Sequence, residues 1–371
     1  MSRYLAKKAV STPSPPVKIP SKLPSAQTLA EFKLPEPSIE HLRRLTDDTG
    51  LYQHAKFILP DRKEGYCTDD NARAVIVMTQ YYARKPETEA LKLLDVYMSF
   101  VLQSQKKNGL IRNFMNFNRT WRKGESQNDA LGRILWACGT VLVEPPSPGH
   151  LRLALECFDR SIWNLQKQRL RGLAYGIFGI CGYLKRFPEA KDIKNQMQLA
   201  AEQLVAQYGK NSLPDWRWFE DVLTYDNGVL PQALFAAGLV LENKKFLEAA
   251  QEACEFLIGK TFTDEHFSFV GCQGWYVRGQ KKAQFDQQPI EAASMVLMLG
   301  AAYNATGDKN FLALQKRAFE WFLGANEAGI PLYDFASKGC CDGLTVDGVN
   351  ANQGAESILS FLLARLSLYQ S

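Results

Sequence analysis

The sequence predicts an all-α protein, an (α/α)6 barrel in which parallel inner helices are surrounded by outer helices. Two kinds of segment alternate along its 371 residues. One kind opens with polar or acidic residues and continues as a helix rich in Ala, Gly and large apolar side chains. The other kind is apolar on one helical face and charged on the opposite face, as an outer helix requires. No strand pattern of comparable length occurs, so the alternation predicts two concentric rings of helices.

The expected inner helices are apolar on every face. Their segments begin near residues 68, 127, 171, 225, 286 and 352 and read "TDDNARAVIVMTQYYA", "QNDALGRILWACGTVL", "RGLAYGIFGICGYL", "YDNGVLPQALFAAGLVL", "DQQPIEAASMVLMLGAAY" and "NQGAESILSFLLARLSLY". A helix without a polar face is buried all round, and its Gly and Ala residues let neighbouring backbones approach closely. Pro289 falls in the first turn of its segment, where a missing N–H does no harm.

The expected outer helices separate these segments. They read "SIEHLRRLTDDTGL", "ETEALKLLDVYMSFVLQSQ", "LRLALECFDRSIWNLQ", "DIKNQMQLAAEQLVAQY", "FLEAAQEACEFLIG" and "FLALQKRAFEWFLG". In the second of them, Leu91, Leu94 and Met98 recur on one helical face. Gly307 follows the fifth inner segment, where a helix is expected to end.

Composition divides the chain into a tail, residues 1–34, and a single toroid domain, residues 35–371. The tail is basic and rich in Pro and Ser, so we expect it to be disordered. The net charge is +5, and residues 1–30 carry five basic residues and no acid, so the rest of the chain is close to neutral. This balance argues against a nucleic-acid partner. No apolar run is long enough to cross a bilayer. The eight cysteines form no CxxC pair, which fits reduced thiols in a cytoplasmic protein.

The topology predicts where the polar openings meet. If outer and inner helices alternate, all inner helices run parallel and their N-termini gather at one mouth of the barrel. Acidic side chains at these openings are therefore expected to converge: Asp69, Asp70, Asp129, Asp226, Asp286, Glu291 and Glu356.

Aromatic and amide side chains in the same loops point to a glycan substrate. Aromatic rings stack on the C–H faces of a sugar, while amides and carboxylates bind its hydroxyl groups. The expected substrate-binding residues are Tyr66, Asn71, Trp216, Trp218, Trp275, Gln287, Glu291, Gln353 and Glu356.

Paired carboxyl groups are the means by which glycosidic bonds are cut, one as acid and one as base or nucleophile. Asp70 and Asp129 are the leading acid/base candidates, and Asp69, Asp226 and Asp286 are supporting carboxylates. Either the adjacent Asp69–Asp70 pair or a pair across the barrel meets the requirement. A single aspartate at a helix start is often only a cap, and Asp69 is the residue more suited to that role.

Over residues 36–370 the sequence resembles the six-hairpin glycosidase superfamily. The stretch "TDDNARA" is similar to the paired aspartates of the endo-α-mannanase branch, which carries over to Asp69 and Asp70. The stretches "LTDDTGLYQHAKF", "GYCTDDNARA", "FDQQPIEAA" and "NQGAES" also resemble uncharacterised helical domains found beside, or fused to, bacterial glycosyltransferases. The resemblance implies a glycoside hydrolase without cofactor, and a glycosyltransferase as a possible partner.

Two other functions stay open. The N-acylglucosamine epimerase branch shares the expected fold and resembles a histidine-driven site. Here only His54, which follows the first outer segment, is placed to reach the mouth. The toroid could also be a non-catalytic module that binds glycans or docks on a glycosyltransferase.

Other ligand classes find little support in the sequence. No Walker or dinucleotide glycine pattern occurs, and no acidic cluster has the spacing of a calcium loop. We therefore expect no metal and no nucleotide cofactor. Two cationic loops, "NRTWRKGE" and "VRGQKK", are expected either to be solvated or to contact an acidic sugar.

Overall fold

The computed structural model describes residues 34–123, 129–263 and 265–369. The tail that the sequence predicts to be disordered lies, up to residue 33, outside the described residues. Within the described part, no helix combines the length and apolarity needed to cross a membrane.

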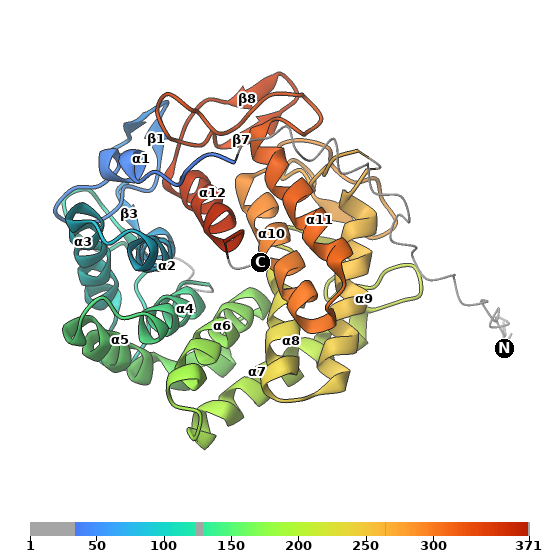
Figure 1. Cartoon of the computed structure of the whole chain (residues 1–371), viewed down its shortest axis with the longest axis horizontal. Helices are drawn as coiled ribbons and strands as arrows, with labels where there is room; N and C mark the ends of the chain where they lie inside the picture. Colours follow the sequence, from blue (N-terminus) through green and yellow to red (C-terminus); the bar gives the residue numbers. More distant parts are fainter. Residues whose placement is uncertain (1–33, 124–128, 264, 370–371) are drawn as a thin grey trace, which may run out of the picture.

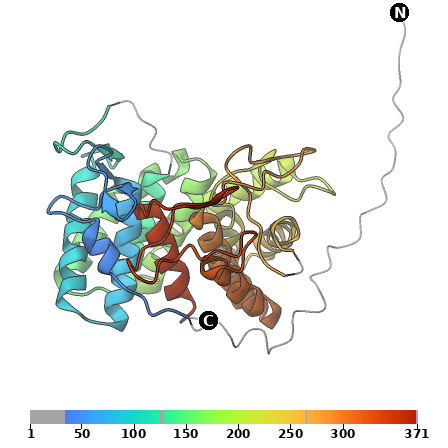
Figure 2. The ribbon, with the colours of Figure 1, turned by 90° about the horizontal axis from the view of Figure 1, so that it is seen from above.

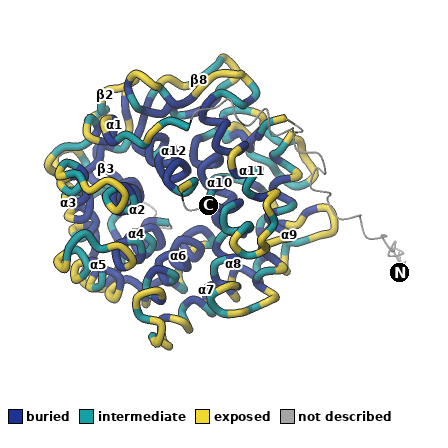
Figure 3. The backbone as a smooth tube through the Cα atoms, viewed as in Figure 1, coloured by how far each residue is buried: buried dark blue, intermediate teal, exposed yellow. Residues whose placement is uncertain are grey.

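Six helices form a closed inner ring (Figure 1). They are α2 (Thr68–Arg84), α4 (Ala130–Val143), α6 (Leu170–Arg186), α8 (Val229–Val240), α10 (Pro289–Thr306) and α12 (Ala355–Ser367). Each inner helix packs against the next, and α12 packs against α2 to close the ring. Their buried surfaces contrast with the exposed outer faces of the molecule (Figure 3). The predicted (α/α)6 barrel is confirmed.

The outer ring consists of α1 (Glu40–Arg44), α3 (Thr88–Ser104), α5 (Pro148–Ser161), α7 (Lys191–Asn211), α9 (Lys244–Thr261) and α11 (Lys309–Glu320). Two of these helices continue as 3₁₀ turns, η2 (Ile162–Lys167) and η3 (Trp321–Leu323). Seen from the side, the ring is about one helix deep (Figure 2).

The first outer helix is shorter than its sequence segment suggests. Helix α1 ends at Arg44, whereas the expected segment runs to Leu51. The side chain of Asp47 accepts hydrogen bonds from the backbone N–H groups of Thr49 and Gly50. Asp47 thereby stabilises a turn in place of further helix, as aspartate often does.

Short antiparallel strand pairs connect the loops at the mouth. Strand β3 (Tyr66–Cys67), before α2, pairs with β4 (Phe114–Met115), after α3. Strand β5 (Val222–Leu223), before α8, pairs with β6 (Tyr276–Val277), before α10. Two local hairpins complete the set, β1 (Ala55–Lys56) with β2 (Leu59–Pro60), and β7 (Gly343–Thr345) with β8 (Gly348–Asn350). Loops from different hairpins of the barrel therefore hold one another in place.

Glycines bring α4 and α6 into backbone contact. A Cβ atom on Gly132 would lie 2.2 Å from the carbonyl oxygen of Gly172, and one on Gly139 would lie 2.3 Å from that of Gly179. The close approach that the sequence predicts for the inner helices is present at this contact.

Candidate active site

A cavity of about 470 Å³ opens where the inner helices begin. Six carboxyl groups line it, those of Asp69, Asp70, Asp129, Asp286, Asp342 and Glu356. Five of these are among the seven acids expected to converge at the mouth. The remaining two of the seven expected acids, Asp226 and Glu291, are buried and do not line the cavity.

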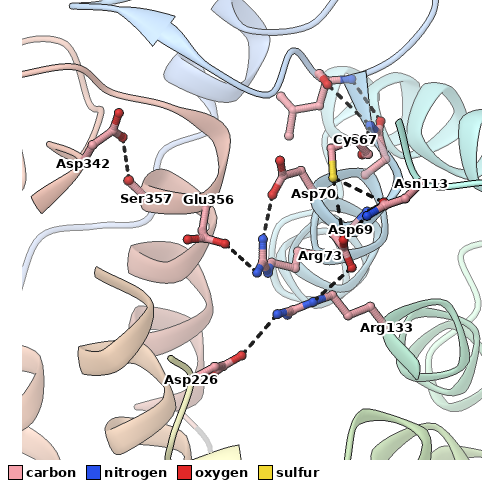
Figure 4. Close-up of polar contacts among 12 residues, drawn as sticks. Cys67, Asp69, Asp70, Arg73, Asn113, Arg133, Asp226, Asp342, Glu356 and Ser357 are labelled. Carbon is pink, nitrogen blue, oxygen red and sulfur yellow. Dashed lines mark hydrogen bonds and ion pairs between the residues drawn. The ribbon is translucent and has the colours of Figure 1, made fainter. Parts of the chain in front are cut away.

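Helix α2 supplies two carboxylates and a buried arginine. Asp70 lies in the first turn, and Arg73, one turn later, donates a 2.6 Å hydrogen bond from Nη1 to Oδ1 of Asp70. The Nη2 group of Arg73 donates to Oε2 of Glu356 on α12 at 2.7 Å (Figure 4). Because a buried charge is stable only when it is paired, this arginine holds two carboxylates of neighbouring helices at the cavity wall.

A second buried arginine lies between α2 and the loop before α8. Arg133 on α4 places Nε 3.3 Å from Oδ1 of Asp69 and Nη2 3.3 Å from Oδ2 of Asp226 (Figure 4). The hydroxyl of Tyr175 on α6 accepts a 2.7 Å hydrogen bond from Arg133 and donates one to Asp226. The Arg133 guanidinium also lies 4.0 Å from the centre of the Tyr175 ring. Asp226 is thus a buried partner for Arg133.

Glu291 fixes the backbone next to Asp226. Its carboxylate accepts hydrogen bonds from the backbone N–H of Asp226 and, at 2.8 Å, from Nδ2 of Asn227. Burial, together with the nearby charge of Asp226, raises the pKa of Glu291 to about 8. Glu291 is therefore not placed to bind a sugar, the role that the sequence predicts for it, because its carboxylate oxygens already accept hydrogen bonds from Asp226 and Asn227.

The acid/base character of the site is set mainly by burial. Burial raises the pKa of Asp70 to about 6, Arg73 opposes this shift, and the charges of Glu356 and Asp69 add to it. Burial also raises the pKa of Asp69, against the influence of Arg133. A carboxyl group with a pKa near 6 can hold a proton close to neutral pH, which a general acid requires.

Asp69 does not cap α2, contrary to the role that the sequence favours for it. The N-cap residue is Cys67, whose side chain accepts no capping hydrogen bond, and Oδ1 of Asn113 accepts a 3.3 Å hydrogen bond from the backbone N–H of Asp69 in the first turn. Oδ2 of Asp69 instead accepts a 2.7 Å hydrogen bond from Nδ2 of Asn113. The pairing of β3 with β4 brings Asn113 to the start of α2, so a loop contact replaces the local cap.

Asp129 is the N-cap residue of α4 and is held by Tyr225, which lies in the loop before α8. The hydroxyl of Tyr225 donates a 2.6 Å hydrogen bond to its Oδ2. Arg171 in turn donates to the backbone carbonyl of Tyr225 at 2.5 Å and lies 4.5 Å from the centre of its ring. Asp286 accepts from Gln273 at 2.9 Å. Both carboxylates remain partly exposed to the cavity.

Several cavity residues were missed by the sequence analysis. Asp342 accepts 2.6 Å and 2.7 Å hydrogen bonds from Oγ of Ser357 and the backbone N–H of Gly354, and burial raises its pKa. It lies in a Gly-rich loop that carries no helical signal. The sequence does contain a signal for Arg73 and Arg133. Each is a single arginine near the start of a helix that is otherwise mostly apolar, and an arginine buried there is stable only when it is paired with an acid.

The expected stacking tryptophans are not at the cavity. Trp216 and Trp218 are buried, with relative exposures of 2% and 0%. Nε1 of Trp216 donates to the carbonyl of Glu220 at 2.7 Å. Trp275 is half-buried against the core and does not line the cavity. Large rings in long loops are buried against the barrel because this removes the most apolar area from water.

The remaining predicted contacts also serve the fold. Tyr66 is buried, and its hydroxyl donates to Asp47 at 2.7 Å. Three buried amides bind loop groups: Asn71 binds Leu51 and Cys67, Gln287 binds Phe269 and Trp321, and Gln353 binds Ser337 and Asp334. The aromatic side chains that line the cavity are Phe114 and Tyr225.

The cavity is acidic, and none of the described residues of the two cationic loops lines it. Arg119 pairs with Asp48, and Arg278 pairs with Asp221, in both cases away from the cavity. The carboxylates of the lining outnumber its two guanidiniums, Arg73 and Arg133. Among the residues that the structure describes, no group of three or more His, Cys, Asp or Glu side chains is placed to hold a metal ion.

Comparisons with known proteins agree with this architecture. No protein-family model and no curated protein sequence matches the chain. Among solved structures, a sugar epimerase from a ruminal bacterium superposes with a TM-score of 0.71 at 14% identity, over 91% of this chain and 97% of that one. A D-mannose isomerase gives 0.68 at 12% identity, over 89% and 94%. A GH76 α-mannanase from Bacteroides thetaiotaomicron gives 0.63 at 9% identity, over 89% and 93%.

These neighbours define the class of fold. At such low identity the likeness concerns the fold alone. The chain has the (α/α)6 toroid fold that these structures share, as the sequence predicts.

Proposed function

We propose that the protein is a glycoside hydrolase, with Asp70 as the general acid and Asp129 as the base or nucleophile. The observation that carries this proposal is Asp70 itself, a buried carboxyl with a pKa raised to about 6 that lines a cavity containing further carboxylates. Glycosidic bonds are cut by two such groups in different protonation states. The volume of the cavity, about 470 Å³, lies in the range of small-molecule sites.

The surrounding residues supply orientation. Arg73 holds Oδ1 of Asp70, so the carboxyl presents its other oxygen to the glycosidic oxygen and delivers its proton there as the bond breaks. Tyr225 holds one oxygen of Asp129, and this carboxylate takes the proton of an attacking water or attacks the anomeric carbon itself. Asp286, Asp342 and Glu356 offer acceptors for the sugar hydroxyl groups.

A sugar epimerase is the second candidate, and His54 is the observation that favours it. His54 lines the cavity, and its charge influences both Asp70 and Asp342. A histidine so placed could move a proton at a sugar carbon. The cavity contains no other histidine among the described residues, so we rank this function second.

The deciding experiment measures turnover of a glycan panel by the wild type, Asp70→Asn, Asp129→Asn and His54→Ala. Hydrolysis by the wild type that both Asn variants lose is the expected result. Asp192→Asn, an exposed aspartate on α7, is the matched control and should retain activity. Equal turnover by the wild type and Asp70→Asn would contradict the assignment.

Two further outcomes have a definite meaning. Interconversion of free monosaccharides that His54→Ala abolishes would favour the epimerase. Glycan binding by the wild type without turnover would favour a non-catalytic module, for which co-purification with a glycosyltransferase is the next test.

A further inference from the structure

A second hollow, of about 650 Å³, adjoins the acidic cavity and is not used by the proposed reaction. The first residues of α6 and the last turns of α7 form most of its lining. Asp129 and Tyr225 line both spaces. The candidate base or nucleophile therefore lies at the junction of two hollows, each large enough for part of a ligand.

The junction is rigidly built. Tyr225 donates its hydroxyl hydrogen bond to Asp129 at 2.6 Å. Arg171, with a relative exposure of 5%, holds the backbone carbonyl of Tyr225 and covers its ring. The same guanidinium donates to Glu220 at 3.0 Å and to Oγ1 of Thr224 at 3.0 Å. The wall between the hollows is thus fixed before any ligand binds.

The two hollows differ in charge. Carboxylates dominate the cavity, whereas the second hollow contains Arg169, Arg171 and Lys210 against Asp129 and Glu220. Arg171 and Glu220 neutralise each other. Within the described part of the chain, Arg169 and Lys210 are exposed and form no ion pair. Gln207 and the side-chain oxygens of Gln168 and Gln203 add hydrogen-bonding groups suited to sugar hydroxyls. The Nε2 groups of Gln168 and Gln203 donate to Asn164 and Gln166.

We propose that the substrate is an oligosaccharide that spans both hollows and carries an anionic group, phosphate or carboxylate, on the part that occupies the second hollow. Arg169 and Lys210 bind this group, because charge-assisted hydrogen bonds to an oxyanion are stronger than neutral ones. The bond that is cut lies beside Asp129, so parts of the substrate are bound on both sides of it, one in each hollow. This inference rests on the proposed function, since it takes the ligand to be a glycan.

The test is a binding experiment that does not depend on turnover. A glycan microarray presents neutral glycans beside their phosphorylated and uronate-containing counterparts. It is probed with the full chain carrying Asp70→Asn, alone and combined with Arg169→Ala and Lys210→Ala together. The matched control combines Asp70→Asn with Lys194→Ala, an exposed lysine on the same helix α7 that does not line the hollow.

We expect anionic glycans to bind more tightly than their neutral counterparts, and this preference to weaken as NaCl rises from 50 to 500 mM. The double alanine substitution should weaken anionic binding about tenfold and leave neutral binding within about twofold. Lys194→Ala should change neither. The phosphorylated and uronate arms identify which oxyanion is bound.

Equal binding of neutral and anionic glycans would overturn the inference, as would a double variant that keeps the preference, or no binding to any glycan. Hydrolysis is measured separately with the wild type. A protein that prefers anionic glycans but hydrolyses none would contradict the proposed function and leave the charge preference established.

Discussion

Arg73 and Glu356, which are 283 positions apart in the chain, form an ion pair of 2.7 Å across the closure of the inner ring. The same arginine holds Asp70 at 2.6 Å. One side chain therefore joins the first inner helix to the last and orients the proposed general acid. The closure of the barrel and the chemistry of the site depend on the same group.

Replacing Arg73 is expected to affect both stability and the acid. In Arg73→Met, Asp70 would remain buried without its cation, and loss of one partner of a buried pair costs about 3–5 kcal/mol. Urea denaturation measures this loss. Arg119→Met, which breaks the exposed pair with Asp48, is the control and should leave the unfolding midpoint almost unchanged. A similar small effect in both variants would show that the Arg73 pairs do not stabilise the fold.

The pH dependence of hydrolysis is expected to report Asp70. A general acid must be protonated, and the pKa of Asp70 is raised to about 6, so kcat/KM should fall as the pH rises through about 6. Asp70→Asn should lower kcat by about 10²–10⁴, the usual contribution of acid–base catalysis. Removing Arg73 should raise the pH at which kcat/KM falls, because Arg73 lowers the pKa of Asp70. A pH profile that is flat between 5 and 8 would exclude Asp70 as the acid.

Stability should decline between about pH 4.5 and pH 8 because of Glu291. Its pKa is raised from 4.5 to about 8 in the folded protein, so the unfolded chain releases this proton first as the pH rises. The resulting stabilisation is complete below about pH 4.5 and is lost as the pH rises through about 8. Denaturation at pH 5, 7 and 9 should therefore show a steeper decline in the wild type than in Glu291→Gln. The exposed Glu202→Gln is the control and should follow the wild type.

The contact between α4 and α6 should not tolerate a methyl group. Gly132→Ala would place Cβ 2.2 Å from a backbone oxygen that cannot move aside, and overpacking of this kind costs about 1–3 kcal/mol. Gly209→Ala in α7 meets no atom within 4 Å and should be neutral, or stabilising by up to about 1 kcal/mol, because alanine favours a helix. Thermal or urea unfolding compares the two. Equal stability of Gly132→Ala and the wild type would mean that the helices are not held this close.

The architecture and part of the site could be predicted from the sequence because both depend on local patterns. Helical periodicity separates inner from outer segments within a few turns of chain. An acid at the start of an inner helix, such as Asp70 or Asp129, is placed at the mouth by that helix alone. Once the helices alternate, the convergence of these acids follows from the topology.

The loops could not be predicted in this way. Trp216 and Asp342 both lie outside the helices. Their neighbouring residues do not indicate whether the Trp216 ring is buried or available for stacking, or whether the Asp342 carboxylate is exposed to solvent or lines the cavity. Their positions follow from which distant segments pack against them: Trp216 packs edge-on against the rings of Phe256 and Tyr276, and Asp342 lines the cavity together with His54. Residues far apart in the chain make these contacts, so only the closed tertiary structure decides which polar and aromatic groups reach the cavity.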